Sequence, residues 1–390
     1  MNNCDMTEWK EYKLGEICTK ITSGGTPKTS EASYYDGNIP WLNTKEVNFN
    51  RIEKTEKYIT EEGYNNSSAK WIPKGSVIIA MYGATAAKVA YSLIDLTTNQ
   101  ACCNLIIDND IADSQFVYYY IQSSYEELLN LACGAAQQNL NVGVIANFQI
   151  LLPPLEEQIR IASILSSLDD KIDLLHRENK TLEAMAETLF RQWFIEEAKE
   201  DDMCLLGEVI KTTSGGTPSR KNEEYYCNGN IEWVKSKELH HSYILDTEEK
   251  ITVEAVHNSS AKLLPENSIL IAMYGATVGE YGIIAKSMTC NQAICALIPN
   301  EKYPYTYLYL WAKFMQDEFI NLACGAAQQN ISQELIKQQY VSNDIKLISD
   351  FHILVNPYME KMKVNQEQIQ TLIQQRDSLL SKLMSGEVKI

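Results

Sequence analysis

Apolar positions along the chain follow two periods, and the longer one marks a helix between residues 154 and 197. From Leu168 to Trp193, apolar side chains recur in alternating steps of four and three residues, which is the spacing of a heptad seam. A di-proline at residues 153–154 precedes this stretch, and proline is common in the first turn of a helix. We therefore expect one helix of about 43 residues, or roughly 65 Å, that ends near Glu197.

A second stretch, from Tyr358 to Leu383, has the same spacing. Its helix should begin near Asp344 and bend at Pro357, because the proline ring removes a backbone hydrogen-bond donor.

Both seams contain polar residues at core-type positions: Asn179 in the first, and Asn365 and Arg376 in the second. Polar residues in such a seam set register and partner choice more often than they add stability. The alternative is that these positions simply tilt toward solvent.

The shorter period belongs to the rest of the chain, residues 1–150 and 203–342. Short β-like runs such as 76–80 and 269–272 alternate with Gly, Pro, Asn and Ser turn signals. Helical patches lie between them, at 116–131 and 305–322. This mixture predicts an α+β fold.

The chain repeats itself at an offset of 191 or 192 residues, which is too long for a solenoid and indicates duplicated domains. We expect two domains, 1–150 and 203–342, each followed by a helical segment, 151–202 and 343–390; a length of 390 residues fits two or three domains. The repeated segments are 23–27 and 214–218 (Ser-Gly-Gly-Thr-Pro), 34–35 and 225–226 (Tyr-Tyr), 67–70 and 259–262 (Ser-Ser-Ala-Lys), 79–85 and 271–277 (Ile-Ala-Met-Tyr-Gly-Ala-Thr), 99–101 and 291–293 (Asn-Gln-Ala), and 130–139 and 321–330.

Composition excludes several classes of protein. An apolar fraction of 45% and a charged fraction of 22% are ordinary for a globular chain, and no run of 18 apolar residues predicts a membrane span. The N-terminus has no apolar segment of a secretory signal. None of the ten cysteines forms a C-x-x-C pair, so we expect free thiols in a reducing cytoplasm and no zinc ribbon.

Catalytic motifs are absent from the sequence. It has no G-x-G-x-x-G or P-loop pattern, and its five histidines include no H-E-x-x-H spacing. An adenine methyltransferase would carry an N/D-P-P-Y/F turn, but residues 152–155 read Leu-Pro-Pro-Leu. Residues 387–389 have an acidic-x-Lys spacing without a partner aspartate. The sequence therefore predicts a non-catalytic chain without a metal site.

Three features together resemble the DNA-specificity subunit of type I restriction–modification enzymes. They are the turn at 23–27 with its copy at 214–218, the helix entry Leu-Pro-Pro-Leu-Glu-Glu-Gln at 152–158, and the stretch 376–386 near the C-terminus. The resemblance covers essentially the whole chain. It departs at 342–344, where Ser-Asn-Asp stands in place of the di-proline, so the second helix entry should differ.

The resemblance implies that each domain is a target-recognition domain that reads one half of a bipartite DNA site. The two long helices would form an antiparallel coiled-coil spacer at which two methyltransferase (modification) subunits dock. Those subunits would methylate adenine with S-adenosylmethionine, ATP-dependent restriction subunits would cut the DNA, and this chain would bind no cofactor itself. The candidate partner-binding residues are those of the two seams: Leu168, Ile172, Leu175, Leu182, Leu189, Met362, Ile369, Leu372, Leu379 and Leu383.

DNA reading needs side chains that reach bases and phosphates. Asn and Gln pair bidentately with adenine, Lys and Arg pair with guanine, and hydroxyls, backbone amides and lysines hold phosphates. Each candidate also has a structural interpretation: the amides could cap a helix or hold a turn, the tyrosine segments could be buried strands that end in a tight turn, and the glycines could form a scaffold β-turn. The candidates are Ser23, Gly24, Thr26, Lys28, Lys45, Lys70, Tyr82, Lys88, Asn99, Gln100, Gln137, Gln138, Asn139, Ser214, Gly215, Thr217, Lys235, Lys237, Lys262, Tyr274, Asn291, Gln292, Gln328, Gln329 and Asn330.

The net charge of −17 argues against a chain that wraps a polyanion by itself. It also supports an alternative function, a non-catalytic scaffold that binds a carbohydrate or a protein. The charge is unevenly distributed, however. Residues 1–92 are neutral overall, whereas the helical segment 151–202 carries −7. We therefore expect weak DNA binding by the isolated chain and stronger binding beside basic partners.

Overall fold

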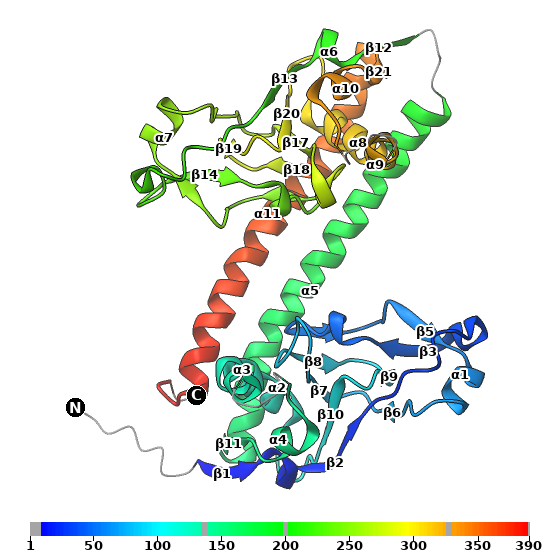
Figure 1. Ribbon diagram of the computed structural model, residues 1–390, viewed down its shortest axis with the longest axis vertical. Coiled ribbons are helices and arrows are strands. Elements are labelled where there is room, and N and C mark those ends of the chain that lie inside the picture. Colours follow the sequence, from blue (N-terminus) through cyan, green and yellow to red (C-terminus); the bar gives the residue numbers. More distant parts are fainter. Residues whose placement is uncertain (1–8, 134–138, 198–201, 325–329, 389–390) are drawn as a thin grey trace. The chain divides into compact units, whose positions relative to one another are not determined.

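A computed structural model describes residues 9–133, 139–197, 202–324 and 330–388 of the chain (Figure 1). The chain divides into two compact units. Unit 1 consists of Met1–Ile172 and Leu372–Ile390, and unit 2 of Asp173–Thr371. Each unit therefore contains one of the predicted domains together with parts of both long helices.

Unit 1 is built on a five-stranded sheet in the order β2-β10-β7-β8-β4, a four-stranded sheet in the order β5-β3-β9-β6, and the pair β1-β11. Most neighbours are antiparallel, and β3–β9 and β4–β8 are parallel. The strands are β1 Lys10–Lys13, β2 Cys18–Ser23, β3 Tyr35–Leu42, β4 Asn50–Ile52, β5 Lys57–Ile59, β6 Trp71–Ile72, β7 Val77–Ala80, β8 Val89–Ser92, β9 Leu96–Thr98, β10 Cys102–Ile107 and β11 Gln149–Leu152; the helices are α1 Glu61–Asn65, α2 Ser114–Ser123, α3 Tyr125–Cys133, α4 Val142–Ala146 and the start of α5 Leu155–Arg191.

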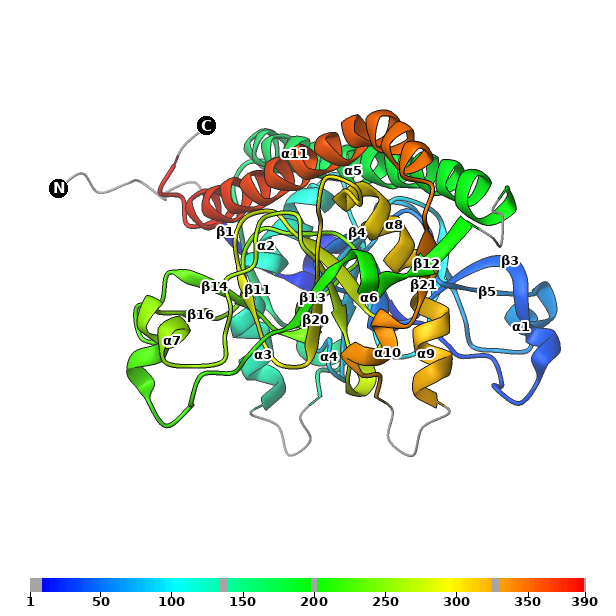
Figure 2. The same cartoon turned by 90° about the horizontal axis from the view of Figure 1, so that it is seen from above.

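Unit 2 repeats this plan with the sheets β13-β20-β17-β18-β15, β16-β14-β19 and β12-β21. The pair β12-β21 lies with α6 and α10 at one end of the unit (Figures 1 and 2). The strands are β12 Met203–Leu205, β13 Lys211–Ser214, β14 Ile231–Val234, β15 Tyr243–Ile244, β16 Lys250–Ile251, β17 Ile269–Ala272, β18 Tyr281–Ile284, β19 Thr289–Cys290, β20 Ile294–Ile298 and β21 Tyr340–Ser342; the helices are α6 Leu206–Val209, α7 Val253–His257, α8 Tyr305–Phe314, α9 Gln316–Cys324, α10 Gln333–Lys337 and most of α11 Ile345–Met384.

The helices largely follow the predicted pattern, with one difference in each domain. The expected helical patch at 116–131 is two helices, α2 and α3, because the chain leaves the helical conformation at Ser124. The patch at 305–322 is also two helices, α8 and α9, which are separated at Met315.

The two long helices begin by different means. Helix α5 starts directly after Pro154 and closes with a π-turn at Gln192–Glu196. Helix α11 instead starts after Asp344, whose carboxylate accepts a hydrogen bond from the backbone amide of Leu347 at 2.9 Å. The carboxylate satisfies an amide that the first turn leaves without a helical partner, which explains how this helix starts without a di-proline. Pro357 lies inside α11, which is continuous to Met384; the bend predicted there stays a prediction.

Within unit 2 the two helices run antiparallel, because Phe190 of α5 contacts Phe351 while the earlier Asn179 contacts the later Asn365. The Asn365 side chain is fully buried and donates to Asn179 Oδ1 at 2.8 Å and to Glu178 Oε2 at 3.0 Å. The interpretation that Asn365 tilts to solvent is therefore wrong, and the amides pair across the seam.

Unit 1 uses an ion pair where unit 2 uses amides. Arg376 of α11 donates to Asp169 of α5 at 2.8 Å, and Tyr119 of α2 donates to the same carboxylate at 2.5 Å. The side chains of Arg376 and Asp169 are only 14% and 7% exposed. Burial, reinforced by the charge of Asp169, raises the pKa of Tyr119 well above its usual range. The hydroxyl therefore stays protonated and keeps donating.

The seam residues predicted to bind partners lie instead in the chain's own core. Ile172, Leu175, Met362, Ile369 and Leu383 are at most 6% exposed, so they cannot form a partner surface as predicted. The other five are half-buried: Leu168, Leu182, Leu189, Leu372 and Leu379. The heptad period marks the face that each helix buries, and that face is taken by the same chain. Large apolar side chains that are exposed on these helices are Ile159, Leu174, Met185, Ile353, Leu354 and Val364.

No helix in the described ranges is long and apolar enough to cross a membrane.

Replacing Asp169 with alanine should destabilise unit 1 by about 3–5 kcal/mol, because it removes the buried partner of Arg376 and the acceptor of the Tyr119 hydroxyl, and leaves the guanidinium only the exposed Asp377. Asp377 is the matched control: it also pairs with Arg376, at 2.8 Å, but its side chain is 55% exposed. Asp377→Ala should therefore cost at most about 1 kcal/mol. Hydrogen exchange of α2 and of residues 372–384 across a urea series measures both changes. Equal losses would contradict the buried pair.

Candidate nucleic-acid interface

The glycine turn, residues 23–27, lies against two other repeated segments. A Cβ atom on Gly24 would lie 2.0 Å from the Thr98 carbonyl oxygen, and one on Gly25 would lie 2.2 Å from the Ser68 carbonyl carbon. The Gly25 amide donates to the Thr98 carbonyl at 2.9 Å, and Trp41 Nε1 donates to the Gly25 carbonyl at 2.9 Å. Only glycine permits backbones to approach this closely.

The copy of this turn, residues 214–218, is built in the same way. A Cβ on Gly215 would lie 2.1 Å from the Cys290 carbonyl oxygen, and one on Gly216 would lie 2.3 Å from the Ser260 carbonyl carbon. Trp233 Nε1 donates to the Gly216 carbonyl at 2.9 Å. The scaffold interpretation therefore holds for the glycines: the candidates Gly24 and Gly215 are buried and cannot contact DNA as predicted.

The tyrosine loop, residues 81–85 with its copy 273–277, follows a fully buried strand; its first residue, Met81 or Met273, is still buried, and the tyrosine after it is exposed. Tyr82 is 36% exposed and Tyr274 is 42% exposed. Gly83 and Gly275 have φ angles of +87° and +70°, and nothing lies within 4 Å of the position of their missing Cβ atoms. The tight turn therefore lifts each tyrosine out of the core toward solvent.

Backbone hydrogen bonds bring the repeated loops of the first domain together. The Met81 amide donates to the Ala101 carbonyl at 2.8 Å, and the Leu140 amide donates to the Met81 carbonyl at 2.8 Å. The Thr26 hydroxyl donates to Gln100 Oε1. We call the polar residues at this meeting point the loop surface; in the first domain it consists of the half-buried Thr26 and the exposed Tyr82, Gln100 and Asn139.

The second domain has the equivalent loop surface. The Met273 amide donates to the Ala293 carbonyl at 2.8 Å, and the Ile331 amide donates to the Met273 carbonyl at 2.9 Å. The Thr217 hydroxyl donates to Gln292 Oε1, and an isolated antiparallel bridge pairs the backbones of Tyr274 and Asn330. Its members are the exposed Thr217, Tyr274 and Gln292 and the half-buried Asn330.

The predicted amides that do not belong to the loop surface divide into three groups. Gln137, Gln138, Gln328 and Gln329 lie outside the described residues, so their role stays a prediction. Asn99 is 8% exposed; its carbonyl oxygen accepts from the Ala101 amide at 3.1 Å, so it holds a turn and does not reach a base. Asn291 makes the same bond to Ala293 but is half-buried.

Most of the predicted lysines already have partners in the chain. Lys28, Lys45 and Lys237 form exposed ion pairs with Glu31, Glu56 and Glu248 at 3.0, 2.5 and 2.6 Å. Exposed pairs contribute little stability and can exchange for a phosphate.

Other predicted lysines and hydroxyls form, or lie beside, hydrogen bonds within their own domain. Lys70 and Lys262 are exposed and donate to the buried Thr22 and Thr213 at 3.1 and 2.7 Å, close to the half-buried Ser23 and Ser214. Lys88 donates to Asn48 Oδ1 at 2.6 Å.

Lys235 differs from the exposed lysines, because its side chain is only 15% exposed and it bonds Glu248 and Glu249 at 3.0 and 3.1 Å. Burial by itself lowers the pKa of Lys235, but these two carboxylates outweigh that effect and raise the pKa above its ordinary value. Lys235 therefore belongs to an ion-pair cluster with Glu248 and Glu249, and its contact with DNA stays a prediction.

Sequence reasoning missed Arg220, which lies two residues beyond the second glycine turn. Its guanidinium rests on two aromatic rings and pairs with Glu249 at 2.7 Å. The available signal was a difference between the copies, since the equivalent residue of the first domain is Thr29.

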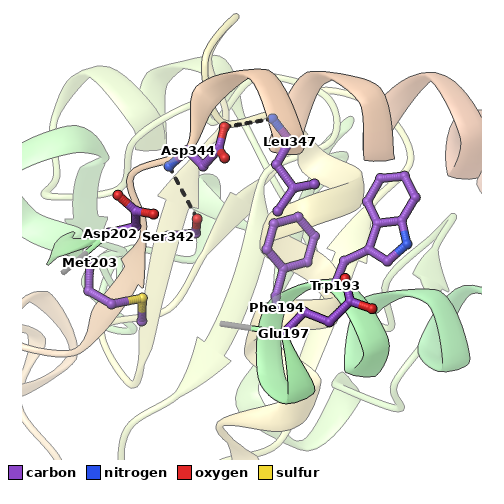
Figure 3. A pocket seen from close by; sticks show the side chains of 8 residues that line it. All are labelled: Trp193, Phe194, Glu197, Asp202, Met203, Ser342, Asp344 and Leu347. Atoms are coloured by element: carbon purple, nitrogen blue, oxygen red, sulfur yellow. Dashed lines mark hydrogen bonds between the residues drawn. The ribbon is translucent and has the colours of Figure 1, made fainter. Parts of the chain in front are cut away.

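A cavity of about 230 Å³ in unit 2 is unsuited to an anion (Figure 3). Its lining includes the carboxylates of Glu197, Asp202 and Asp344. The Asp344 backbone amide donates to Ser342 Oγ at 3.2 Å, and its carboxylate caps α11. These groups organise the start of the helix.

Comparison with known proteins identifies the family. The family described as "Type I restriction modification DNA specificity domain" matches residues 6–184 and 200–342. The MjaIX specificity subunit of a type I restriction enzyme from Methanocaldococcus jannaschii is 28% identical over 424 residues, covering 98% of this chain and 97% of the relative. The HindI specificity subunit from Haemophilus influenzae is 22% identical over 471 residues, covering 98% of this chain and all of the relative.

A solved structure shows the same fold. The S subunit of a type I restriction–modification system from M. genitalium matches with a TM-score of 0.62 and 17% identity, over 98% of each chain. The fold defines a tandem pair of recognition domains joined to long helices. The chain belongs to the type I restriction–modification DNA-specificity family. The family, the α+β fold with duplicated domains, and the non-catalytic role in DNA sequence specificity that the sequence predicted are confirmed.

Gly24→Ala should lower the free energy of unfolding by at least about 1–3 kcal/mol, because the new methyl group overlaps the Thr98 carbonyl. Gly215→Ala should have the same effect in the second domain. Gly143→Ala is the control: its Cβ would meet only Asn141 Oδ1, at 3.2 Å, and alanine favours the helix that contains it. Thermal unfolding compares the three variants, and a wild-type-like Gly24→Ala would show that the close approach is not needed.

Proposed function

We propose that each domain reads one half of a bipartite DNA target through its loop surface. The observation that carries this proposal is a division among the repeated residues. The glycines and Trp41 or Trp233 are buried and build the frame, whereas Tyr82 and Gln100 and their copies are exposed, as is Thr217, and Thr26 is half-buried. The same buried scaffold thus occurs in both domains and holds a similar polar surface in each. Two domains that each recognise one half of a DNA site require this arrangement.

The exposed groups suit the edges of bases and the phosphates between them. The Gln100 and Gln292 amides offer both a donor and an acceptor, which match adenine in the major groove. The threonine hydroxyls suit phosphate oxygens, and the exchangeable lysines beside them supply positive charge. Phosphate contacts would position the domain, and contacts of the amides and the exposed tyrosines with bases would specify the sequence.

The chain would act within a complex. We propose that two modification subunits dock on its helices and methylate adenine with S-adenosylmethionine, and that ATP-dependent restriction subunits cut DNA at the direction of the same chain. The relatives named as specificity subunits of type I restriction enzymes support this assignment. We place the complex in the cytoplasm, where the DNA and the reducing conditions that suit its free thiols are found.

Loops that are identical in the two domains should read the same bases, and loops that differ should read the bases that distinguish the half-sites. Residues 40–45 and 85–88 differ from their copies, 232–237 and 277–280. Long-read sequencing of the methylated motif checks this expectation, and two half-sites with no base in common would contradict it.

Tyr82→Ala should weaken binding of the first half-site only, and Tyr274→Ala of the second only, by about tenfold each, because each tyrosine belongs to one loop surface. Binding of the purified complex is measured with three duplexes: the full target, and targets with either half replaced. Each variant serves as the control of the other. An equal loss with unrelated DNA would show that the tyrosines do not contribute to sequence reading.

The isolated chain should bind its target poorly and the complex should bind it well, because a chain of net charge −17 cannot neutralise many phosphates alone. Affinity measured across a salt series should give a shallow slope for the chain and a steep one for the complex. A steep slope for the isolated chain would contradict partner dependence.

A further inference from the structure

The second domain holds one arginine on an aromatic platform beside its glycine turn. The guanidinium carbon of Arg220 lies 4.3 Å from the centroid of the Tyr226 ring and 5.2 Å from that of Trp233. The turn itself fixes both rings. The Tyr226 hydroxyl donates to the Pro218 carbonyl at 2.7 Å, and Trp233 Nε1 donates to the Gly216 carbonyl at 2.9 Å. The position of the guanidinium therefore follows from the frame of the domain.

A carboxylate fixes the guanidinium from another side. Arg220 Nη2 lies 2.7 Å from Glu249 Oε2, and Lys235 donates to the other oxygen of Glu249 at 3.1 Å. Burial by itself would raise the pKa of Glu249, but the hydrogen bonds from Lys235 and Arg220 lower it below its ordinary value, so the carboxylate is ionised. The Arg220 side chain is nevertheless 55% exposed. It is held in place and still open to solvent.

The first domain has the same platform without the arginine. The Tyr35 hydroxyl donates to the Pro27 carbonyl at 2.8 Å, and Tyr35 and Trp41 meet edge to face at 6.1 Å, as Tyr226 and Trp233 do at 6.0 Å. Thr29 stands at the position of Arg220 and Lys57 at that of Glu249. No cation–π contact over Tyr35 or Trp41 occurs in the described part of the first domain. The arginine with its carboxylate is thus a feature of one half of a duplicated chain.

We propose that Arg220 is a specificity-determining residue of the second domain and reads a guanine in the second half-site. A planar guanidinium can donate to guanine O6 and N7 together, which is the most frequent base-specific contact in protein–DNA complexes. Stacking on two rings and the pair with Glu249 restrict the side chain before DNA arrives, which reduces the entropy lost on binding. Arg220 is three residues from Thr217 of the loop surface. The proposal rests on the proposed function of that surface.

The test uses the complex assembled on the full-length chain, with wild type, Arg220→Lys and Arg220→Ala. Long-read sequencing first defines the methylated motif, and Tyr274→Ala identifies the half-site that belongs to the second domain. Binding is then measured for duplexes with every single base-pair change in that half-site. Wild type should prefer one G·C pair by about 10- to 100-fold over its replacements. Both arginine variants should lose that preference and keep the others.

Three controls separate a base contact from a general effect. Lys302→Ala removes one exposed positive charge of the same unit and should leave every preference unchanged. Arg220→Lys keeps a positive charge at this position. A loss of preference in this variant therefore shows that the planar guanidinium, with its two parallel donors, is needed to recognise guanine. Glu249→Gln removes the negative charge that holds the Arg220 guanidinium in place. It should reduce the same preference, but by less than the two arginine variants do. Thermal unfolding of each complex confirms that the variants remain folded.

Several outcomes would overturn the proposal. One is a second half-site that specifies only A·T pairs. Another is uniform weakening of all duplexes by Arg220→Ala with a salt slope smaller by about one, which would show a phosphate contact. Unchanged preferences in both variants would also overturn it while leaving the loop surface in place. If the wild-type complex neither methylated nor retained DNA, the proposed function itself would fail.

Discussion

The structure of each domain depends on the close approach of one glycine to the end of a neighbouring strand. Gly24 meets the carbonyl of Thr98, and Gly215 meets that of Cys290, at distances that leave no room for a side chain. This contact holds the glycine turn next to the segment that contains Gln100 or Gln292. That segment bonds the tyrosine loop, which in turn bonds the residue after Asn139 or Asn330. One backbone contact therefore begins the chain of contacts that positions every exposed residue of the loop surface.

The two domains keep this frame while their side chains diverge. Phe49 and His241 occupy equivalent positions with the same positive φ angle of 54°, and Asp36 and Asn228 have φ angles of 60° and 56°. Asn, Asp and His adopt the left-handed backbone more readily than other non-glycine residues, but Phe49 has no such preference and has the same φ angle as His241, so at this position the frame imposes it. Duplication followed by divergence can therefore change what a domain reads without changing how its loops are held.

The sequence predicted the parts of the structure that follow from periodicity and repetition. These include the duplicated domains, β17, both long helices and the core-type positions of the polar residues Asn179, Asn365 and Arg376. It could not separate frame from surface, because burial depends on distant segments. Asn99 and Gln100 are adjacent and both recur, yet Asn99 is buried and holds a turn while Gln100 is exposed. Repetition shows that a residue is retained but not which face it occupies. Arg220 was missed for the opposite reason, since a search for repeated residues passes over one that occurs in a single copy.

The pairing of the two long helices needs contacts that fix its register. A heptad seam of apolar residues can slide by one heptad at little cost, and a slide would change the position of whatever each helix carries. Asn365 finds its partners at Asn179 and Glu178, whereas Arg376 finds its partner at Asp169. An amide and a guanidinium are not interchangeable, so a shift by one heptad would take Asn365 away from Asn179 and Glu178, and would take Arg376 away from its buried partner Asp169. In each unit a different polar contact therefore fixes the local register of the seam.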